Sequence, residues 1–436
     1  MKQTPLENWI LKRTGIHERS RQALEEYQIQ QLVSTLHYAK DNSRYYKKLL
    51  AQTDIDSIKT MSGFHAVPFT YPEDIRKKPT DFLCVSEKEV KRIVTLNTSG
   101  TSGEEKRIYF TEEDLNQTID FFQYGMSCLS DQSDRVLVLL PGKAYGSIGD
   151  LLKKALALSH IECIVHGVLR DPEEVEQIIK ENSISCIVGI PMQILYFSRI
   201  KSEVFRKYIK KVLLSTDYVP GVLVQELENR FHCAVFNHYG MTEMGYGGGV
   251  ECQALAGYHL REGDLYFEII DPETGEPAKD GQYGEVVFTT FRRQAMPLIR
   301  YRTGDMARFS QNQCACGTFL RTMDKVTGRI TNKVVFDNLE EMHLRELDEI
   351  ILKYSEVLDY TAAFSQTDML EIRLTLMNGE SFKKLQEEIA ERICSGWKTD
   401  LKLHITWKPD SRIFEITNSM GKRNLIRLQE GGGKDG

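Results

Sequence analysis

Short apolar runs alternate with amphipathic polar stretches through the middle of the chain. The runs have the length of buried strands, and the stretches between them, such as residues 172–182 and 220–231, carry apolar positions at helical spacing. Strands that are separated by helices pair in parallel, so the pattern predicts an α/β fold with parallel sheets and helices on their faces. The predicted strands are 135–140, 163–165, 184–190, 211–214 and 234–236.

The pattern changes on both sides of this region. Residues 18–50 have helical spacing, and residues 264–290 read as strands joined by two turn signals, which predicts a β-rich subdomain. After residue 329 a compact α+β unit of about 100 residues follows. Its predicted elements are a helix at 340–356, strands at 360–364 and 370–377, a helix at 381–394 and a strand at 401–407. We therefore expect a large domain at 1–329, a small mobile domain at 330–430 and a disordered tail at 431–436.

Composition and charge narrow the class of protein. A chain of 436 residues favours two domains, and a net charge of −6 gives no reason to expect a nucleic acid or an anionic membrane as partner. No apolar run has the length of a membrane span, and the N-terminus lacks an apolar signal region, so a cytoplasmic location is expected. The nine cysteines are scattered, which argues against a disulfide framework.

A loop rich in glycine and hydroxyl groups follows a predicted strand end at residues 94–96. Such a loop can direct backbone N–H groups and hydroxyls at phosphate oxygens, although the spacing differs from that of a Walker loop. A flexible polar loop is an equally good interpretation of this segment by itself. The candidate phosphate-binding residues are Thr98, Ser99, Gly100, Thr101, Ser102 and Gly103, with Lys106 shortly after them.

Four further positions carry candidate chemistry. Tyr239-Gly240-Met241-Thr242-Glu243 follows a predicted strand, at the sheet edge where open α/β sheets bind ligands. Asp305 could accept two hydrogen bonds from a vicinal diol, and Lys422 could supply a positive charge on a long stem. Each has an ordinary alternative: an acid in a surface loop, a surface ion pair for Arg329, or a lysine in a polar tail.

Cysteine and histidine residues form two clusters on either side of the β-rich region. Three thiols and an imidazole match a closed tetrahedral zinc site of structural type, which leaves no position open for catalysis. Buried free cysteines are the alternative, because Cys-x-Cys is a less usual spacing for zinc than Cys-x-x-Cys. The candidate ligands are Cys252, His259, Cys314 and Cys316.

These segments, taken in order, resemble the adenylate-forming superfamily, which includes acyl-CoA synthetases, luciferases and peptide-synthetase adenylation domains. The resemblance implies that Thr242 contacts the α-phosphate of ATP, that Glu243 holds Mg²⁺ and that Asp305 takes the ribose hydroxyls. It further implies that Arg329 touches ribose or phosphate and that Lys422 bridges the carboxylate and the phosphate. Tyr239 would pack on the adenine, and residues 215–217 would flank it.

The sequence departs from that superfamily at two places. Glu104 and Glu105 separate the phosphate loop from Lys106, whose family counterpart follows the loop directly and reaches the β- and γ-phosphates. The hinge, usually Asp or Lys two residues after the arginine, is Thr331 here. These departures leave the role of Lys106 and the hinge position open, while the domain boundary stands.

Several stretches resemble the phenylacetate–CoA ligase branch in particular, among them residues 42–46, 67–70, 284–290 and 297–305. That resemblance implies an aryl or arylacetic acid as substrate, with ATP, Mg²⁺ and coenzyme A. The acid would be adenylated, the smaller domain would rotate, and the CoA thiol would then attack. A subset of this branch carries a structural Zn²⁺ beside the central motif. A homodimer is compatible with this branch, and the sequence does not fix the oligomeric state.

Two questions stay open at the level of sequence. The acyl acceptor is CoA or, alternatively, an amine, a carrier-protein thiol or nothing; a non-catalytic nucleotide-binding protein is disfavoured by the intact motifs. The acyl pocket is also unresolved. Tyr145 is a candidate for one wall, and glycines 247–249 either make room for a bulky substrate or only let the backbone turn.

Overall fold

The computed structural model describes residues 2–96, 105–279, 281–336, 340–366, 369–397, 401–409, 423 and 425–427. The chain divides into two compact units, of which the first contains residues 1–167 and 236–326 and the second residues 168–235 and 327–436. The predicted phosphate loop, Lys422 and the predicted tail at 431–436 lie outside the described residues. The second unit resumes at Thr327, close to the predicted boundary after residue 329, and it also contains 168–235.

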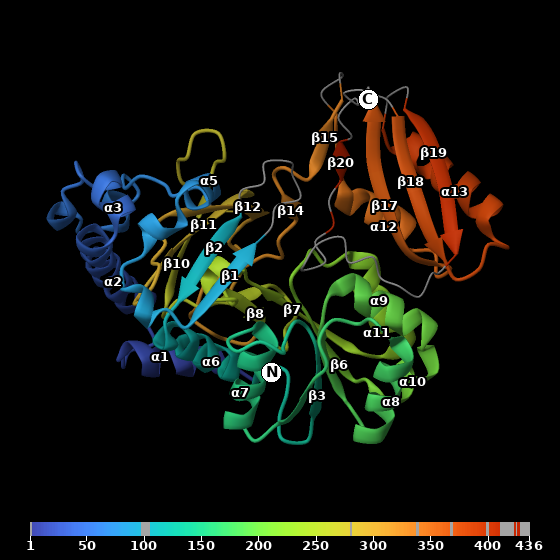
Figure 1. Ribbon diagram of the computed structural model, residues 1–436, viewed down its shortest axis with the longest axis horizontal. Coiled ribbons are helices and arrows are strands. Elements are labelled where there is room, and N and C mark those ends of the chain that lie inside the picture. Colours follow the sequence, from blue (N-terminus) through green and yellow to red (C-terminus); the bar gives the residue numbers. More distant parts are fainter. Residues whose placement is uncertain are drawn as a thin grey trace. The chain divides into compact units, whose positions relative to one another are not determined.

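The first unit begins with helices that pack on its β-rich part. The blue helices in Figure 1 lie beside the antiparallel strands β10, β11 and β12. Tyr27 and Gln28 of α2 donate hydrogen bonds to the carbonyls of Gly263 and Glu262, just before β10. The helices are α1 (Pro5–Thr14), α2 (Arg21–Asn42), α3 (Arg44–Leu49), α4 (Met61–Phe64) and α5 (Pro72–Lys77).

Two antiparallel arrangements in this unit position the candidate site. The hairpin β1 (Arg92–Leu96) and β2 (Lys106–Phe110) pairs Leu96 with Lys106. The strands β10 (Leu265–Ile270), β11 (Gly284–Thr290) and β12 (Tyr301–Ala307) pair in that order. All residues of β10 and β11 are buried, whereas burial alternates along β12, so one face of β12 is turned into the core.

The remaining strands of the first unit come from the beginning and the end of the predicted α/β region and from the segments after it. β3 (Arg135–Leu139) and β4 (Glu162–Val165) are parallel, with α6 (Glu112–Met126) and α7 (Ile148–Leu158) nearby in the chain. α6 begins with a capping box, because Thr111 and Asp114 exchange backbone and side-chain hydrogen bonds. β7 (Ala234–Tyr239), β8 (Gly249–Glu251), β9 (Tyr258–Leu260) and β13 (Thr322–Met323) form antiparallel pairs in that order.

The second unit combines a parallel pair with an α+β layer. β5 (Cys186–Gly189) and β6 (Lys211–Leu214) are parallel and accompany α8 (Pro172–Asn182), α9 (Pro191–Ile200), α10 (Ser202–Tyr208) and α11 (Gly221–Phe231). β17 (Val357–Gln366), β18 (Met369–Leu376) and β19 (Lys402–Pro409) form a sheet whose edge strand is β20 (Ile426–Arg427). Figure 1 shows α13 (Phe382–Gly396) and α12 (Leu344–Ile351) beside these orange strands.

The elements predicted from periodicity are confirmed with one difference in the second unit. Residues 340–356 were expected as one helix, but residues Glu341–His343 form strand β16 and α12 begins only at Leu344. β16 pairs with β15 (Lys333–Val335) in a hairpin, so strand pairing overrides the helical pattern of these residues. β14 (Gly328–Arg329) precedes this hairpin. The predicted fold class, mixed α/β with a β-rich subdomain and an α+β C-terminal part, is confirmed.

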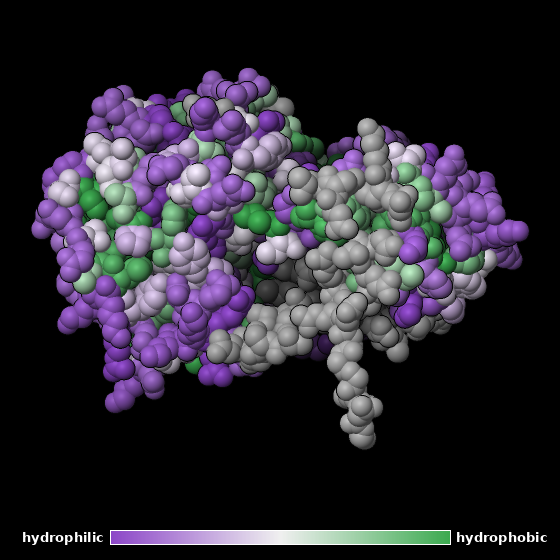
Figure 2. Space-filling view, turned by 90° about the horizontal axis from the view of Figure 1, so that it is seen from above, coloured by the Kyte–Doolittle hydropathy of each residue, from purple (hydrophilic) through white to green (hydrophobic). Residues whose placement is uncertain are grey.

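The visible surface is mainly hydrophilic, with small green apolar areas (Figure 2). Among the residues that the structure describes, no helix combines the length and the apolar content that a bilayer crossing requires. The large apolar side chains with substantial exposure are spread over many elements: Tyr71, Ile93, Tyr145, Leu158, Tyr283, Val335, Met377 and Trp407.

Candidate functional site

Glu243 lies at the centre of a buried polar cluster in the first unit. It follows β7 in a single turn of 3₁₀ helix, Thr242–Met244, and both Thr242 and Glu243 are buried. The Nζ of Lys106 forms an ion pair with Oε1 of Glu243, and Nζ also donates to the Tyr301 hydroxyl at 3.2 Å. The Tyr301 hydroxyl donates to the same Oε1 at 3.1 Å. The structure thus joins Lys106 to Glu243, across 137 positions of sequence.

Tyr301 lies in the stretch 297–305, but the sequence alone assigns it no role. The signal that could have found it is the alternation of β12, which turns Tyr301, Thr303 and Asp305 to the buried side. Asp305 accepts a hydrogen bond from the Tyr239 hydroxyl at 3.2 Å. One face of β12 therefore presents a hydroxyl and a carboxylate to the two ends of the Tyr239–Glu243 segment.

Arg300 and Arg302, which flank Tyr301, form structural ion pairs. Arg300 is almost fully buried and contacts Glu268 through Nε and Nη2, at 3.1 and 2.8 Å. Its Nη1 donates to the carbonyl of Val67 at 2.7 Å, and Phe69 covers the guanidinium at 4.0 Å from the ring centroid. Arg302 pairs with Glu285. Both arginines stabilise the strand that carries Tyr301 and Asp305.

The glycines after Glu243 pack against the protein's own side chains. A Cβ at Gly247 would overlap the Phe121 ring, and a Cβ at Gly248 would lie 2.7 Å from the Met244 sulfur. The space beside these glycines is therefore already filled, so close packing of the backbone explains them better than room for a bulky substrate. Tyr145, the proposed wall residue, is exposed and donates a hydrogen bond to Glu112.

The structure does not bring all the predicted nucleotide-binding residues into one described cluster. Arg329 belongs to the second unit, where it lines a hollow together with Asp217, Asn332, Asp348 and Arg423. The six predicted phosphate-loop residues and Lys422 lie outside the described part of the chain. The hairpin pairing nevertheless defines where the loop begins and ends, because Leu96 and Lys106 are direct partners.

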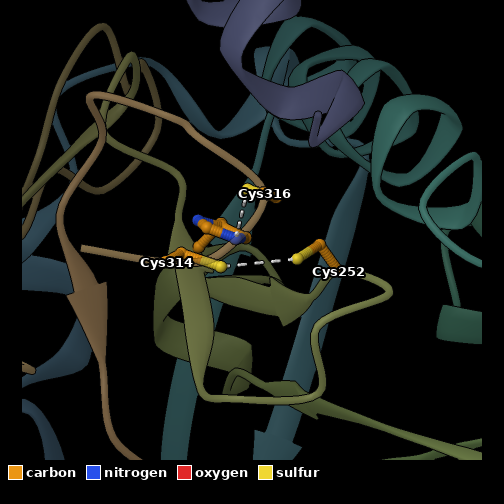
Figure 3. A group of neighbouring side chains, drawn as sticks. Cys252, Cys314 and Cys316 are labelled. Carbon is orange, nitrogen blue, oxygen red and sulfur yellow. Dashed lines mark hydrogen bonds between the residues drawn. The ribbon is translucent and has the colours of Figure 1, made fainter. Parts of the chain in front are cut away.

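The predicted cysteine and histidine residues converge in the first unit. In Figure 3 the three labelled cysteine side chains lie close together. His259 belongs to the same group. All four ligand atoms lie within 4.8 Å of one another, and all four residues are buried. Cys252 and His259 come from β8–β9 and the connection between them, whereas Cys314 and Cys316 come from the loop before β13.

The spacing of these atoms fits a tetrahedral zinc ion. With Zn–S near 2.3 Å and Zn–N near 2.0 Å, a tetrahedron has edges of about 3.8 Å between sulfurs and about 3.6 Å between sulfur and nitrogen. The Sγ atoms of Cys252 and Cys314 are 3.7 Å apart, and Sγ of Cys316 lies 3.6 Å from Nε2 of His259. Without a metal, burial raises the pKa of the Cys252 thiol and lowers the pKa of His259 to about 4. A buried cation offsets the desolvation that disfavours thiolates.

Comparisons with known proteins find a family and relatives that match this chain. A family model described as AMP-binding enzyme matches residues 17–292. The chain is 26% identical over 349 residues to the phenylacetate-coenzyme A ligase of Pseudomonas putida, with 77% of both chains covered. It is 24% identical over 421 residues to the Escherichia coli K12 protein of the same name, with 92% of this chain and 93% of that one covered.

A solved structure shows the fold independently of sequence. The 2-hydroxyisobutyryl-CoA ligase in complex with 2-HIB-AMP aligns with a TM-score of 0.79 at 15% sequence identity. The alignment covers 93% of this chain and 89% of that chain. The family model confirms the resemblance to the adenylate-forming superfamily, and the two relatives agree with the resemblance to its phenylacetate–CoA ligase branch.

Proposed function

The chain belongs to the AMP-binding enzyme family, and from that premise we propose that it activates a carboxylic acid with ATP and transfers the acyl group to coenzyme A. The observation that carries the proposal is the buried Lys106–Glu243–Tyr301 cluster, with Asp305 and Tyr239 beside it. A buried carboxylate paired to a lysine at a predicted phosphate site is typical of a catalytic centre rather than of a stability element.

The first step, formation of the acyl-adenylate, requires that negative charge on the phosphate oxygens be neutralised. A carboxylate oxygen of the acid attacks the α-phosphorus of ATP, the bond to the bridging oxygen breaks, and pyrophosphate leaves. Glu243 would hold Mg²⁺, which offsets the charge on the phosphate oxygens. Thr242 would donate to the α-phosphate and Asp305 would accept from the ribose hydroxyls. Lys422 would contact both reacting oxygens in this step only.

Lys106 supports the same step from a different strand. Its Nζ already lies at Glu243, and a lysine there can turn to the β- and γ-phosphates when nucleotide is bound. The Tyr301 hydroxyl is hydrogen-bonded to both partners and so orients the lysine and the carboxylate toward each other.

In the second step the thiolate sulfur of CoA attacks the acyl carbonyl carbon, and AMP leaves with the oxygen that it shared with the acid. The thiol proton passes to solvent. The substrate class that we propose is an aryl or arylacetic acid, because two relatives are named phenylacetate-coenzyme A ligase.

We assign Zn²⁺ to Cys252, His259, Cys314 and Cys316. With four protein ligands the ion has no position left for substrate, so its contribution is to hold the loop at 314–316 against β8 and β9. Elemental analysis of protein purified without chelator should find one zinc per chain. Cys314→Ser should lower that ratio strongly, whereas Cys394→Ser should not, since Cys394 is exposed and outside the cluster. Full-length protein without zinc would refute the assignment.

The test of the function is acid-dependent exchange between ATP and labelled pyrophosphate, over a panel of aryl, arylacetic and fatty acids. We expect exchange with the first two classes, and loss of exchange in Glu243→Gln. Production of AMP that depends on added CoA identifies the acceptor. Exchange without any effect of CoA would favour an amine, a carrier-protein thiol or no acceptor instead, and absence of exchange with every acid would refute the proposal.

A further inference from the structure

Tyr246 has a backbone conformation that a tyrosine rarely adopts. Its φ of 67° lies in the left-handed region, where the Cβ of any residue except glycine crowds the backbone. The residue comes three positions after Glu243, in the tip of the hairpin that β7 and β8 form, residues 240–248. Strained residues of this kind persist only where their surroundings fix them, and they are concentrated at functional sites. The contacts of Tyr246 therefore matter for the candidate site.

The backbone of Tyr246 closes the tip of this hairpin. Its N–H donates to the carbonyl of Met241 at 2.9 Å. A Cβ at Gly240 would overlap the carbonyl oxygen of Tyr246, so the two branches of the tip touch there. The single turn of 3₁₀ helix that bears Glu243 lies between these contacts and is enclosed by them.

The side chain of Tyr246 attaches the tip to two other parts of the first unit. Its ring is stacked on that of Phe110 in β2, with 6° between the planes and 5.5 Å between the centroids. Its hydroxyl donates to the carbonyl of Gly146, just before α7, at 3.2 Å. The residue is only 9% exposed, so both contacts are made largely out of water. The ring and the hydroxyl together offset the strain of the backbone.

Strand β2 connects Tyr246 with the ion pair of Glu243. Side chains alternate along a strand, so Lys106 and Phe110, four positions apart, leave β2 on the same side. Lys106 pairs with Glu243, and Phe110 stacks on Tyr246. The tip is therefore attached to one face of β2 at two points, one charged and one apolar. Because only three positions of a closed turn separate Glu243 from Tyr246, a shift at one point moves the other.

We propose that Tyr246 is a positioning residue for Glu243. Its contacts with Phe110 and Gly146 hold the tip, and the tip sets the carboxylate against Lys106. The catalytic consequence of this positioning rests on the proposed function, whereas the contacts themselves do not. Displacement of a catalytic group by about 1 Å can lower a rate by about 100-fold. A tyrosine that served only to fill the core would contribute by burial and would need no left-handed backbone.

Tyr27 of α2 offers a matched control in the same unit. It is 8% exposed, its ring meets Phe291 edge-on, and its hydroxyl donates to the carbonyl of Gly263 at 3.0 Å. Tyr27 thus resembles Tyr246 in burial, in its aromatic neighbour and in its hydrogen bond, but it lies in a helix outside the hairpin tip. Tyr27→Ala and Tyr246→Ala should lose stability to a similar extent, and only Tyr246→Ala should disturb Glu243.

The first experiment measures the interaction between Lys106 and Glu243 without any substrate. Urea unfolding of the unmodified protein, Lys106→Met, Glu243→Gln and the double variant gives their coupling free energy as a double-mutant cycle. We expect this coupling to fall by about half or more when the cycle is repeated in Tyr246→Ala. It should be largely retained in Tyr246→Phe, which keeps the stacked ring, and unchanged in Tyr27→Ala. Equal coupling in every background would overturn the proposal.

Tyr246→Gly separates positioning from stability. Glycine adopts a positive φ without steric cost, so this variant should unfold at a higher urea concentration than Tyr246→Ala. It lacks the ring as well, so the coupling between Lys106 and Glu243 should stay as low as in Tyr246→Ala. If the coupling instead recovered together with stability, Tyr246 would act through stability alone and the proposal would be wrong.

The second experiment measures acid-dependent pyrophosphate exchange in the same variants. We expect kcat to fall about 10- to 100-fold in Tyr246→Ala and in Tyr246→Gly, and to change little in Tyr246→Phe and Tyr27→Ala. An unchanged kcat in Tyr246→Ala would overturn the positioning role. An unmodified protein that gave no exchange with any acid would instead overturn the proposed function, and the coupling cycle would still decide whether Tyr246 positions Glu243.

Discussion

At the scale of single residues, one carboxylate oxygen organises the candidate catalytic centre. Oε1 of Glu243 takes both the Lys106 ion pair and the Tyr301 hydroxyl. A buried carboxylate is costly unless its charge is compensated, and the lysine supplies that compensation while the tyrosine hydroxyl donates to the same oxygen. The tyrosine is therefore as important to the geometry as the two charged residues that the motifs single out.

Tyr301→Phe should reduce acid-dependent pyrophosphate exchange by roughly 10-fold, because a hydrogen bond to a charged group is worth about 1.5 kcal/mol or more. The ring remains, so the thermal unfolding midpoint should move little. Tyr283→Phe is the matched control, since Tyr283 is exposed near the turn before β11. Undiminished exchange in Tyr301→Phe would mean that the hydroxyl does not orient Lys106 and Glu243.

Arg300→Ala should destabilise the first unit by about 3–5 kcal/mol, because it removes the arginine partner of the buried Glu268 carboxylate. The double variant Arg300→Met with Glu268→Gln should recover much of that loss, since no buried charge then remains. Thermal or urea unfolding of the three proteins measures the difference. A single variant as stable as the double one would contradict this account of the ion pair.

At the scale of elements, helix α1 supports the loop that carries two of the proposed zinc ligands. Glu7 of α1 is almost fully buried, and its Oε2 accepts from the Thr318 hydroxyl at 2.6 Å and from the N–H of Phe319 at 3.1 Å. Thr318 comes two residues after Cys316. The first helix of the chain is thereby attached to a loop more than 300 positions later, and the proposed metal closes the other side of that loop.

Glu7→Ala should speed the loss of zinc to an excess of chromogenic chelator several-fold, because the loop at 314–318 loses its carboxylate anchor. Glu7→Gln should lie between, since an amide oxygen can still accept both hydrogen bonds but the ion pair with Arg19 is lost. Glu391→Ala, exposed on α13, is the control. Identical release rates in all four proteins would show that α1 does not stabilise the metal loop.

At the scale of the whole molecule, acid should weaken the fold through a buried histidine. Burial lowers the pKa of His238 to about 4, below the value near 6.5 that it has in an unfolded chain. Between these two values the unfolded state binds the proton and the folded state does not, so stability falls as pH falls.

The thermal unfolding midpoint should therefore decrease from pH 7 toward pH 4, with the His238 contribution complete near pH 4. Its slope is at most about 1.4 kcal/mol per pH unit. His238→Gln should make the decrease shallower over this interval while leaving ordinary carboxylate titration below it. If the variant and the unmodified protein lost stability in parallel, His238 would not be the group responsible.

Much of the fold and part of the site could be predicted because the relevant signals are local. The strand and helix periodicities between residues 134 and 238 reproduce the observed elements closely, and the β12 motif places Asp305 on a buried face. The helix expected at 340–356 shows the limit of prediction from periodicity, because Glu341–His343 form a strand that pairs with Lys333–Val335. Arg300 and Arg302 show the same limit of prediction. No local pattern indicates that Glu268 and Glu285 are their ion-pair partners.

The sequence by itself determined the order of the motifs, the class of fold and the residue types available for chemistry, since these depend on composition and on spacing within a few residues. Tertiary structure alone decided that Tyr301 meets Glu243 and that Arg423 meets Asp217. The physical reason is that such contacts join segments far apart in the chain, and their geometry follows from how whole elements pack.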